Sequence, residues 1–221
     1  CVYHLPLGSP RNKAFLKEND FRCCNGSGIE AFTLLNSGIY FHDNSNLWVN
    51  LYIPSEVSWK EKNSVLAQTG NFPQNPSVTF TVSAKKKTAF TLNLFIPSWA
   101  KKAEVYVNGE KIQEEITPLS YLNINREWKN KDKIELRFHY DFHLKTMPDD
   151  ENVIALFYGP VMLAFETPGE LTLKGTHTEI LKNLSPVGNR TFRLSDNGKE
   201  YLLRPLYDIH EESYGVYATI R

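Results

Sequence analysis

The feature that most constrains the fold is a series of short alternating segments between residues 47 and 147. Apolar and polar residues alternate in 77–83, in 89–97 and again in 103–112. A period of two places successive side chains on opposite faces of a strand, so each segment predicts a strand with one buried face. Prolines fall between the segments, where strands tolerate them. The pattern therefore predicts an antiparallel β-sandwich at 45–147.

Two local patterns make this prediction specific. Asn108-Gly109 lies between two short β-type runs, and this dipeptide is the strongest short-range signal for a hairpin. In segment 89–97 the alternation predicts a single inward face. That face consists of Phe90, Leu92, Leu94 and Ile96.

A helix is expected ahead of the strands, over about 28–39. Ser27 and Glu30 have the spacing of a capping box, and Gly38 is expected to end the helix. Apolar residues recur every three or four positions, which indicates one apolar face. They are Ile29, Phe32, Leu34 or Leu35, and Ile39.

The rest of the chain, 148–221, is expected to form a second, smaller β region. Two runs near its start, VIALFYGP and VMLAF, are apolar on both faces and predict buried strands. Residues 167–198 are rich in Gly, Pro, Asn and Ser and are expected to be mostly loop. Two further β-type runs end the sequence.

Charge and hydropathy exclude some partners. Lys plus Arg and Asp plus Glu are both 25, so the formal net charge is zero. A balanced charge predicts no nucleic-acid partner, and the absence of a long apolar run predicts no membrane partner. The run Lys85-Lys86-Lys87 is interpreted as a solvated turn.

The adjacent pair Cys23-Cys24 is the most reactive feature of the sequence. The chain has three cysteines and the third is Cys1, so no disulfide framework can stabilise most of the fold. Neighbouring thiols are poorly placed for a disulfide, but a thiolate can act as a nucleophile or as a zinc ligand. The alternative is that both side chains are small buried apolar groups.

No other residues form a recognisable catalytic pattern. The six histidines are scattered, and no spacing pairs the carboxylates as a glycosidase needs. Aromatic side chains could stack on sugar rings, although core packing is the alternative. The aromatic residues considered are Trp48, Tyr52, Trp59 and Trp99.

Several sequence blocks, in order, resemble glycoside hydrolase family 127, the β-L-arabinofuranosidase family. The blocks are FRCCNGSGIEAF, GIYFHDNSNLWVNLYIPSEVSW, FIPSWA, VYVNGE, INREWKNKDKIEL and VIALFYGPVMLA, and together they span about 1–165. The resemblance implies an (α/α)-toroid catalytic domain followed by β-sandwiches. It therefore implies a mainly β chain from the C-terminal part of such a protein. Its expected parts are a short helical remnant of the toroid at 1–44, the sandwich at 45–147, and a region at 148–221 that packs back on one of them.

The resemblance also implies a site. Cys23 matches the family's nucleophile and zinc ligand, Cys24 matches a second zinc ligand, and Tyr3 resembles a tyrosine of the substrate pocket. The family's other zinc ligands, its acid/base glutamate and its sugar-binding histidines have no counterpart in this sequence. Zinc is thus the expected cofactor of the full-length protein, bound weakly or not at all by this chain.

Two functional hypotheses follow. In the first, the chain is part of a retaining hydrolase of plant-type glycans or arabinofuranosides, inactive by itself, from a bacterial cytoplasm or periplasm. In the second, it is a non-catalytic carbohydrate-binding or structural module. Loss of the toroid would expose the apolar helix face, and self-association through that face is expected.

Overall fold

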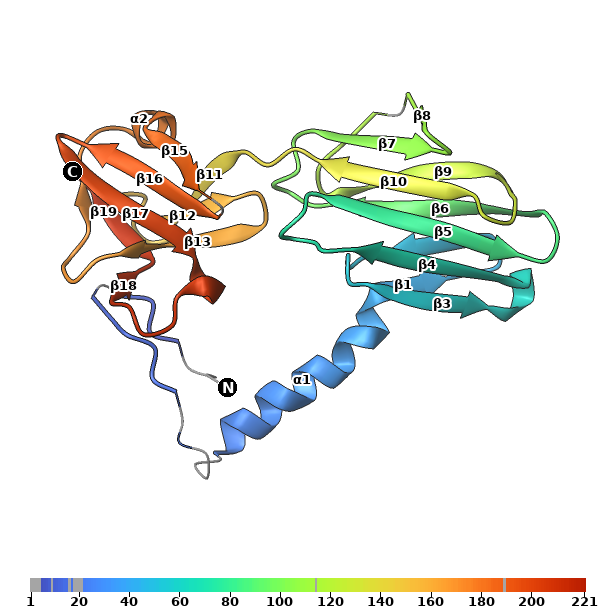
Figure 1. Cartoon of the computed structure of the whole chain (residues 1–221), viewed down its shortest axis with the longest axis horizontal. Coiled ribbons are helices and arrows are strands. Elements are labelled where there is room, and N and C mark those ends of the chain that lie inside the picture. Colours follow the sequence, from blue (N-terminus) through green and yellow to red (C-terminus); the bar gives the residue numbers. More distant parts are fainter. Residues whose placement is uncertain (1–4, 9, 16, 18–21, 114, 189) are drawn as a thin grey trace. The chain divides into compact units, whose positions relative to one another are not determined.

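The computed structural model describes residues 5–8, 10–15, 17, 22–113, 115–188 and 190–221. The chain divides into two compact units (Figure 1). The central unit is Glu30–Tyr140, and the terminal unit combines Cys1–Ile29 with Asp141–Arg221. Tyr3, the predicted substrate-pocket residue, lies outside the described residues. Both units are built mainly from antiparallel strands, which confirms the predicted fold class.

The central unit contains a four-stranded and a six-stranded sheet. Their strand orders are β1-β2-β6-β9 and β3-β4-β5-β10-β7-β8. A 3-10 turn, Lys60–Lys62, joins β3 to β4. The strands are β1 (Tyr40–His42), β2 (Asn46–Val49), β3 (Ser55–Trp59), β4 (Ser64–Gly70), β5 (Ser77–Ala84), β6 (Thr88–Ile96), β7 (Ala103–Val107), β8 (Glu110–Lys111), β9 (Ser120–Trp128) and β10 (Lys133–Phe138).

The core of the central unit follows the predicted alternation. All four residues of the predicted inward face of β6 are at most 3% exposed. They share one apolar cluster with Val78, Phe80 and Val82 of β5. The indole Nε1 of Trp128 is satisfied there, because it donates to the Phe90 carbonyl at 2.9 Å. Burial of alternate residues from both sheets therefore stabilises this sandwich.

In this unit, local sequence signals were sufficient to predict one hairpin but not one strand pairing. The Asn108-Gly109 hairpin is confirmed, with φ values of 53° and 88° and Val107 opposite Glu110. Strand β2, however, pairs with β6 in parallel. The chain forms β3, β4 and β5 of the other sheet in between, and this long crossover lets it return in the same direction.

The terminal unit is a single sheet with the order β14-β19-β12-β13-β17-β16-β15; β11 pairs with β12 and β18 with β13. Its apolar core contains Leu156, Leu163 and Phe165. The strands are β11 (Phe142–Thr146), β12 (Val153–Tyr158), β13 (Val161–Glu166), β14 (Thr172–Leu173), β15 (Leu184–Gly188), β16 (Thr191–Asp196), β17 (Lys199–Pro205), β18 (Tyr214–Gly215) and β19 (Tyr217–Ile220); a 3-10 turn lies at Leu206–Asp208.

Two expectations for this part of the chain are corrected. Residues 142–146 were expected in the first sandwich, but β11 pairs along its length with β12. Residues 167–198 were expected to be loop, yet they contain β15, β16 and helix α2 (His177–Lys182). The start of α2 is fixed by a capping box, in which the Thr176 hydroxyl accepts from the Glu179 N–H and the Glu179 carboxylate accepts from the Thr176 N–H.

Residues 6–7 and 11–13 are bound along residues 206–216 within the terminal unit. Arg11 and Tyr214 exchange backbone hydrogen bonds of 2.9 and 2.7 Å. The Tyr214 hydroxyl donates to the Pro6 carbonyl at 2.6 Å, and the Lys13 ammonium donates to the carbonyls of Leu206 and Ile209. Burial lowers the pKa of Lys13, although Glu212 and Asp208 oppose the shift. One isolated bridge, between Arg11 and Tyr214, and these side-chain bonds thus attach the early residues to the terminal unit.

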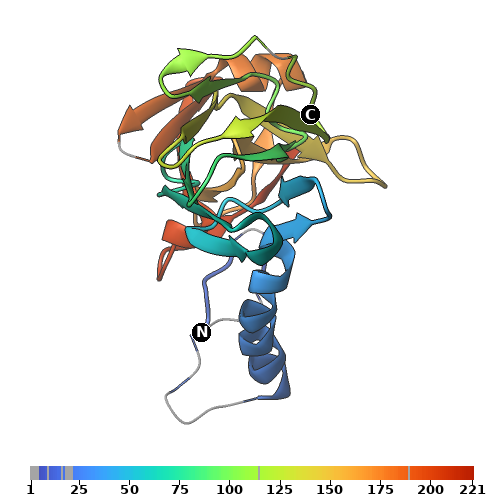
Figure 2. The same ribbon diagram turned by 90° about the vertical axis from the view of Figure 1, so that its right-hand side faces the viewer.

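Helix α1 (Cys23–Ile39) is one continuous rod that leads into β1 (Figure 1, Figure 2). It begins four residues before Ser27, so the predicted cap at Ser27 is wrong. The backbone N–H of Arg22 instead donates to the Asn25 side chain at 3.3 Å, which gives the first turn a side-chain partner. None of the helices within the described ranges is long and apolar enough to cross a membrane.

Candidate functional site

Cys23 and Cys24 lie in the first turn of α1. The Cys23 thiol is exposed, and Cys24 is half-buried. The pair therefore does not fill a core in this chain, in contrast to the alternative of two buried apolar groups. The two Sγ atoms are 3.8 Å apart. Two thiols thus point to the same side of the helix start, where they can share a proton or a ligand.

The electrostatics of the helix start favour negative charge. The first turn lies at the positive end of the helix dipole, which stabilises a thiolate. The pKa of Cys24 is raised, mainly because of its hydrogen bond and charge interaction with Cys23, and Arg22 opposes this shift. The proton affinity of the Cys24 thiol therefore depends on its neighbour Cys23.

The distance between the two sulfur atoms fits that between two sulfur ligands of one zinc ion. Sulfur ligands of a tetrahedral zinc lie about 2.3 Å from the metal, which separates two of them by about 3.8 Å. The observed Sγ–Sγ distance has this value. In the part of the chain that the structure describes, no three His, Cys, Asp or Glu side chains form a metal-binding group. The pair can therefore supply two ligands of a zinc site, and the others are not among the described residues.

The aromatic residues considered for sugar stacking belong largely to the core. Tyr52 and Trp59 are 6% and 2% exposed. Trp99 packs against Phe138 with its ring centroid 5.1 Å away. Trp48 is half-buried within β2. These residues provide no open aromatic platform, so they do not support a sugar-binding face.

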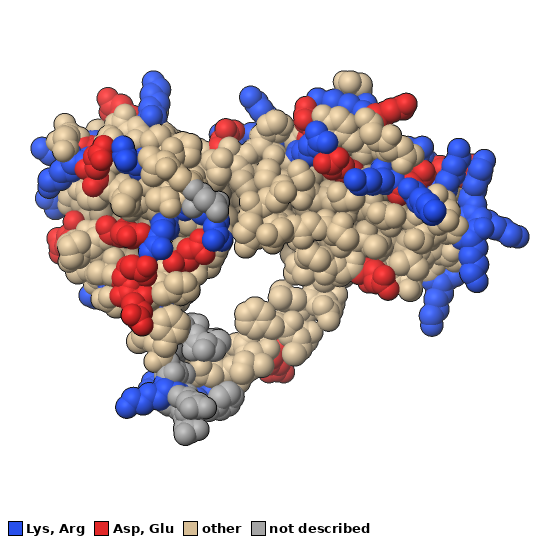
Figure 3. Space-filling view, in the orientation of Figure 1, with Lys and Arg blue, Asp and Glu red and all other residues tan. Residues whose placement is uncertain are grey.

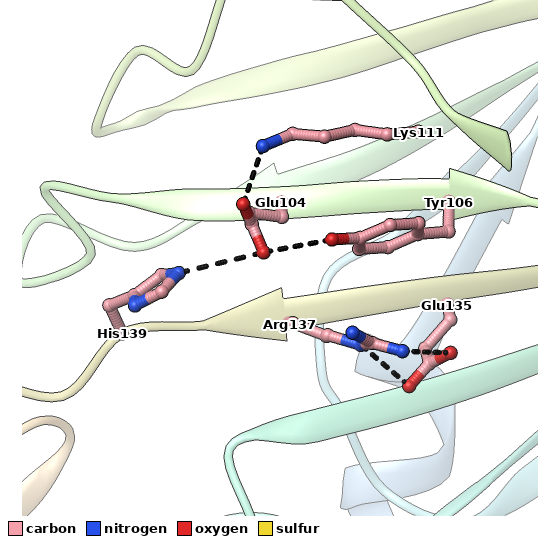
Figure 4. Close-up of polar contacts among 6 residues, drawn as sticks. All are labelled: Glu104, Tyr106, Lys111, Glu135, Arg137 and His139. Atoms are coloured by element: carbon pink, nitrogen blue, oxygen red, sulfur yellow. Dashed lines mark hydrogen bonds and ion pairs between the residues drawn. The ribbon is translucent and has the colours of Figure 1, made fainter. Parts of the chain in front are cut away.

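A polar cluster that the sequence did not indicate lies on the six-stranded sheet (Figure 4). The Glu104 carboxylate accepts from the Lys111 ammonium at 2.5 Å and from the Tyr106 hydroxyl at 3.1 Å. It also faces the His139 Nε2 at 3.8 Å. Strands β7 and β10 are neighbours, which brings these side chains together, but only the fold reveals that pairing.

The same cluster holds a second carboxylate. Arg137 donates to both oxygens of Glu135 at 2.8 and 3.0 Å, and its guanidinium lies 4.3 Å from the Tyr106 ring centroid. Hydrogen bonds from Lys111 and from Arg137 lower the pKa of Glu104 and of Glu135, respectively. A glycosidase acid needs a raised pKa. Neither glutamate is therefore suited to be the acid/base residue, and the cluster is better described as a fixed surface network.

Comparisons with known proteins agree with the family resemblance of the sequence. Residues 46–140 match the family model described as the β-L-arabinofuranosidase GH127 middle domain. None of the curated protein sequences matches the chain.

The similarity to solved structures covers most of the chain. A GH127 β-L-arabinofuranosidase from Geobacillus stearothermophilus has a TM-score of 0.72 and 20% identity, covering 90% of this chain and 37% of its own. A structure described as a glycoside hydrolase has a TM-score of 0.72 and 18% identity, with coverages of 96% and 41%. A GH127 β-arabinofuranosidase has a TM-score of 0.68 and 22% identity, with coverages of 90% and 38%.

The chain spans about two fifths of the length of these structures. The alignment of the fold runs through both units, whereas the sequence match lies in the two-sheet part of the central unit. The resemblance to glycoside hydrolase family 127 is therefore confirmed: residues 46–140 match the model of that family's middle domain, and the chain shares its fold with solved structures of that family.

Proposed function

We propose that this chain is the C-terminal portion of a retaining glycoside hydrolase of the β-L-arabinofuranosidase type, with Cys23 as its nucleophile. The observation that carries the proposal is the exposed thiol of Cys23 at the start of α1, 3.8 Å from a second thiol. The match of residues 46–140 to the GH127 middle domain supports the choice of reaction. The substrate class is a plant-type glycan or another arabinofuranoside.

The chemistry assigned to Cys23 is a double displacement. The Cys23 thiolate attacks the anomeric carbon, so a C–S bond forms while the glycosidic C–O bond breaks and the leaving oxygen takes a proton from an acid. Water then attacks the same carbon and gives a proton to the conjugate base of that acid, the C–S bond breaks, and the thiolate is regenerated. Two inversions at one carbon give net retention. The start of α1 assists both steps because it stabilises the thiolate that attacks and then leaves.

We propose further that Cys23 and Cys24 are two ligands of a zinc ion in the longer protein. When bound, the metal keeps the sulfur ligands deprotonated near neutral pH. The remaining ligands and the acid/base residue would come from parts of the protein that this chain does not include. The chain by itself is then expected to hold zinc weakly and to hydrolyse nothing.

The deciding experiment measures hydrolysis of an aryl β-L-arabinofuranoside by the longer protein and by its Cys23→Ala variant. The variant is expected to lose turnover by several orders of magnitude, because no other nucleophile replaces the thiolate. Mass spectrometry of the wild-type protein with a slow substrate is expected to show a glycosyl group on the peptide that contains Cys23.

A matched control is Cys1→Ala, which removes a thiol to which the proposal assigns no role and should leave turnover unchanged. Cys24→Ala should reduce the zinc content measured by atomic absorption as well as turnover. Full turnover by Cys23→Ala would rule the proposal out.

A further inference from the structure

Lysines are concentrated at one end of the central unit. We define the basic tip as residues 60–63, 84–88 and 129–133. It contains eight lysines and two acidic residues, a formal charge of +6 in a chain whose net charge is zero. Figure 3 shows Lys and Arg side chains crowding this end of the unit. The lysines are Lys60, Lys62, Lys85, Lys86, Lys87, Lys129, Lys131 and Lys133.

The fold, rather than the sequence, makes this cluster. The three segments connect β3 to β4, β5 to β6 and β9 to β10, and all of these turns lie at the same end of the two sheets (Figure 1). Hydrogen bonds fix them to one another. The Lys62 ammonium donates to the Ala89 carbonyl at 3.1 Å, and the Ala84 N–H donates to the Asn130 side chain at 3.3 Å. The Lys131 N–H donates to the Val82 carbonyl at 2.8 Å.

Two acidic groups at the tip or next to it, Asp132 and Glu127, are already engaged, whereas Glu61 lines a hollow at the tip. The Asp132 carboxylate is buried and accepts from the Lys129 N–H at 2.7 Å and from the Asn108 amide at 2.9 Å. Glu127 pairs with Lys87 at 3.4 Å, with both side chains more than half exposed. Within the described ranges, no ion pair involves Lys85 or Lys86. These ammonium groups are therefore available to an external anion.

The basic tip contains a hollow in which such an anion could bind. Its volume is about 430 Å³, and it is open to solvent between the 3-10 turn after β3 and the β5–β6 turn. Its walls combine four lysines, a hydroxyl and an amide with one carboxylate, that of Glu61, so cationic donors that suit a polyhydroxylated anion outnumber the acidic group. The residues that line it are Glu61, Lys62, Asn63, Lys85, Lys86, Lys87 and Thr88.

We propose that the basic tip is a binding site for an acidic polysaccharide, with the lysines recognising carboxylate groups along the glycan. This choice of ligand rests on the proposed function, which gives the protein a glycan to act on. Single-stranded nucleic acid requires exposed aromatic rings on which bases stack. The rings beneath the tip, Trp59, Phe90 and Trp128, are at most 3% exposed. The tip segments also contain no large apolar side chain that could insert into a membrane.

The site would act separately from the cysteine pair. It would hold the protein on an acidic region of plant-type polysaccharide while the catalytic domain acts on arabinofuranosyl groups nearby. A second attachment point on the same polymer raises the effective concentration of the substrate. Neutral oligosaccharides gain nothing from this attachment, so the basic tip would contribute to selection of the polymer.

The experiment measures binding of the 221-residue chain to polygalacturonate by titration calorimetry at low ionic strength. Binding is expected, and it should weaken steeply as salt is added because the contacts are charge–charge contacts. The variant Lys85→Gln/Lys86→Gln is expected to bind on the order of tenfold more weakly. The control Lys101→Gln/Lys102→Gln removes the same charge from the β6–β7 connection, at the other end of the unit, and should bind as the wild type does.

Three outcomes would overturn the proposal. They are equal loss of affinity in both variants, no binding to polygalacturonate, and tighter binding to single-stranded DNA or to phosphatidylserine vesicles than to the glycan. Because the readout is binding of a polymer that the enzyme is not proposed to cleave, it is independent of hydrolysis. A failed Cys23 experiment and a failed binding experiment can therefore be told apart.

Discussion

The side chain of Asn108 connects a hairpin to the neighbouring turn through Asp132. Its amide donates to the Asp132 carboxylate at 2.9 Å, and its carbonyl oxygen accepts from the Lys133 N–H at 2.8 Å. Burial alone would raise the pKa of Asp132, but hydrogen bonds from Lys129 and Asn108 and nearby cations hold the pKa below its ordinary value. The left-handed conformation of the hairpin is thus coupled to a buried carboxylate.

The first prediction tests that conformation. Gly109 has a φ of 88°, and a Cβ added there meets no atom within 4 Å. Gly109→Ala should therefore destabilise the protein by about 1 kcal/mol through the backbone alone. The control Gly169→Ala also adds a Cβ in open space, but without a positive φ, and should leave stability nearly unchanged. Urea unfolding followed by tryptophan fluorescence measures both, and equal stability of the two variants would contradict the prediction.

The second prediction concerns acid sensitivity. The Arg204 guanidinium, together with the His210 N–H, lowers the pKa of Glu212 from 4.5 to about 2. A carboxyl group with a lowered folded pKa contributes stability that is present above its unfolded pKa and lost as pH falls toward the folded value. Glu212→Gln should therefore melt below the wild type at neutral pH, and the difference should shrink between about pH 4.5 and pH 2. The control Glu211→Gln removes the same charge from the neighbouring residue, and its Tm difference from the wild type should not change in this way with pH.

The Glu212 experiment uses thermal unfolding across this pH range. A Tm difference between wild type and Glu212→Gln that stays constant as the pH falls would contradict the assignment. The ion pair between Arg204 and Glu212 lies beside the hydrogen bonds that hold the N-terminal segment, since Lys13 donates to the carbonyls of Leu206 and Ile209. Hydrogen exchange in residues 5–13 should therefore increase in parallel with the loss of stability.

The third prediction concerns the thiols. The pKa of Cys24 is raised chiefly by Cys23, through their hydrogen bond and their charges. Cys23→Ala should lower the pKa of Cys24 toward its ordinary value and speed its alkylation by iodoacetamide at pH values below about 8.5. All variants carry Cys1→Ala so that only this pair reacts. An unchanged or slower alkylation of Cys24 would show that the two sulfurs do not interact.

The fourth prediction concerns the apolar side chains of α1. Ile29, Phe32, Leu34 and Leu35 are between 40% and 69% exposed, and Glu30 is the sole charged residue of the helix. Such a surface favours association between copies of the chain. Phe32→Glu should shift the chain toward monomer in size-exclusion chromatography with light scattering. Thr33→Glu adds the same charge at a polar position and should change association less; a monomeric wild type would contradict the prediction.

The alternating strands of the central unit were predictable because each local pattern agrees with the global fold. Segment 89–97 has one apolar face and became β6, and Asn108-Gly109 became a hairpin. The parallel pairing of β2 with β6 was not predictable, because it depends on the crossover between sheets and no local residue encodes it. In the terminal unit the Thr176-x-x-Glu179 spacing was a readable capping box, but Gly- and Ser-rich surroundings suggested loop.

The site was predictable only in part. Adjacent cysteines are rare enough to single out a reactive pair, and their placement in the first turn of α1 is new information from the structure. The Glu104 network and the basic tip depend on which strands are neighbours, so residues far apart in sequence had to be brought together by the fold. The run Lys85-Lys86-Lys87 alone is typical of a solvated turn; only beside Lys62 does it line a hollow.

The bonds between residues 6–13 and residues 206–216 have a consequence for biosynthesis. The central unit is continuous in sequence, so it can fold as soon as residue 140 has left the ribosome. The terminal unit cannot fold so early, because Arg11 and Pro6 bond to Tyr214, which lies 208 residues after Pro6. Pro6 and Arg11 therefore stay without these bonds until Tyr214 has been translated, and termination before that residue would leave them without their partner strand.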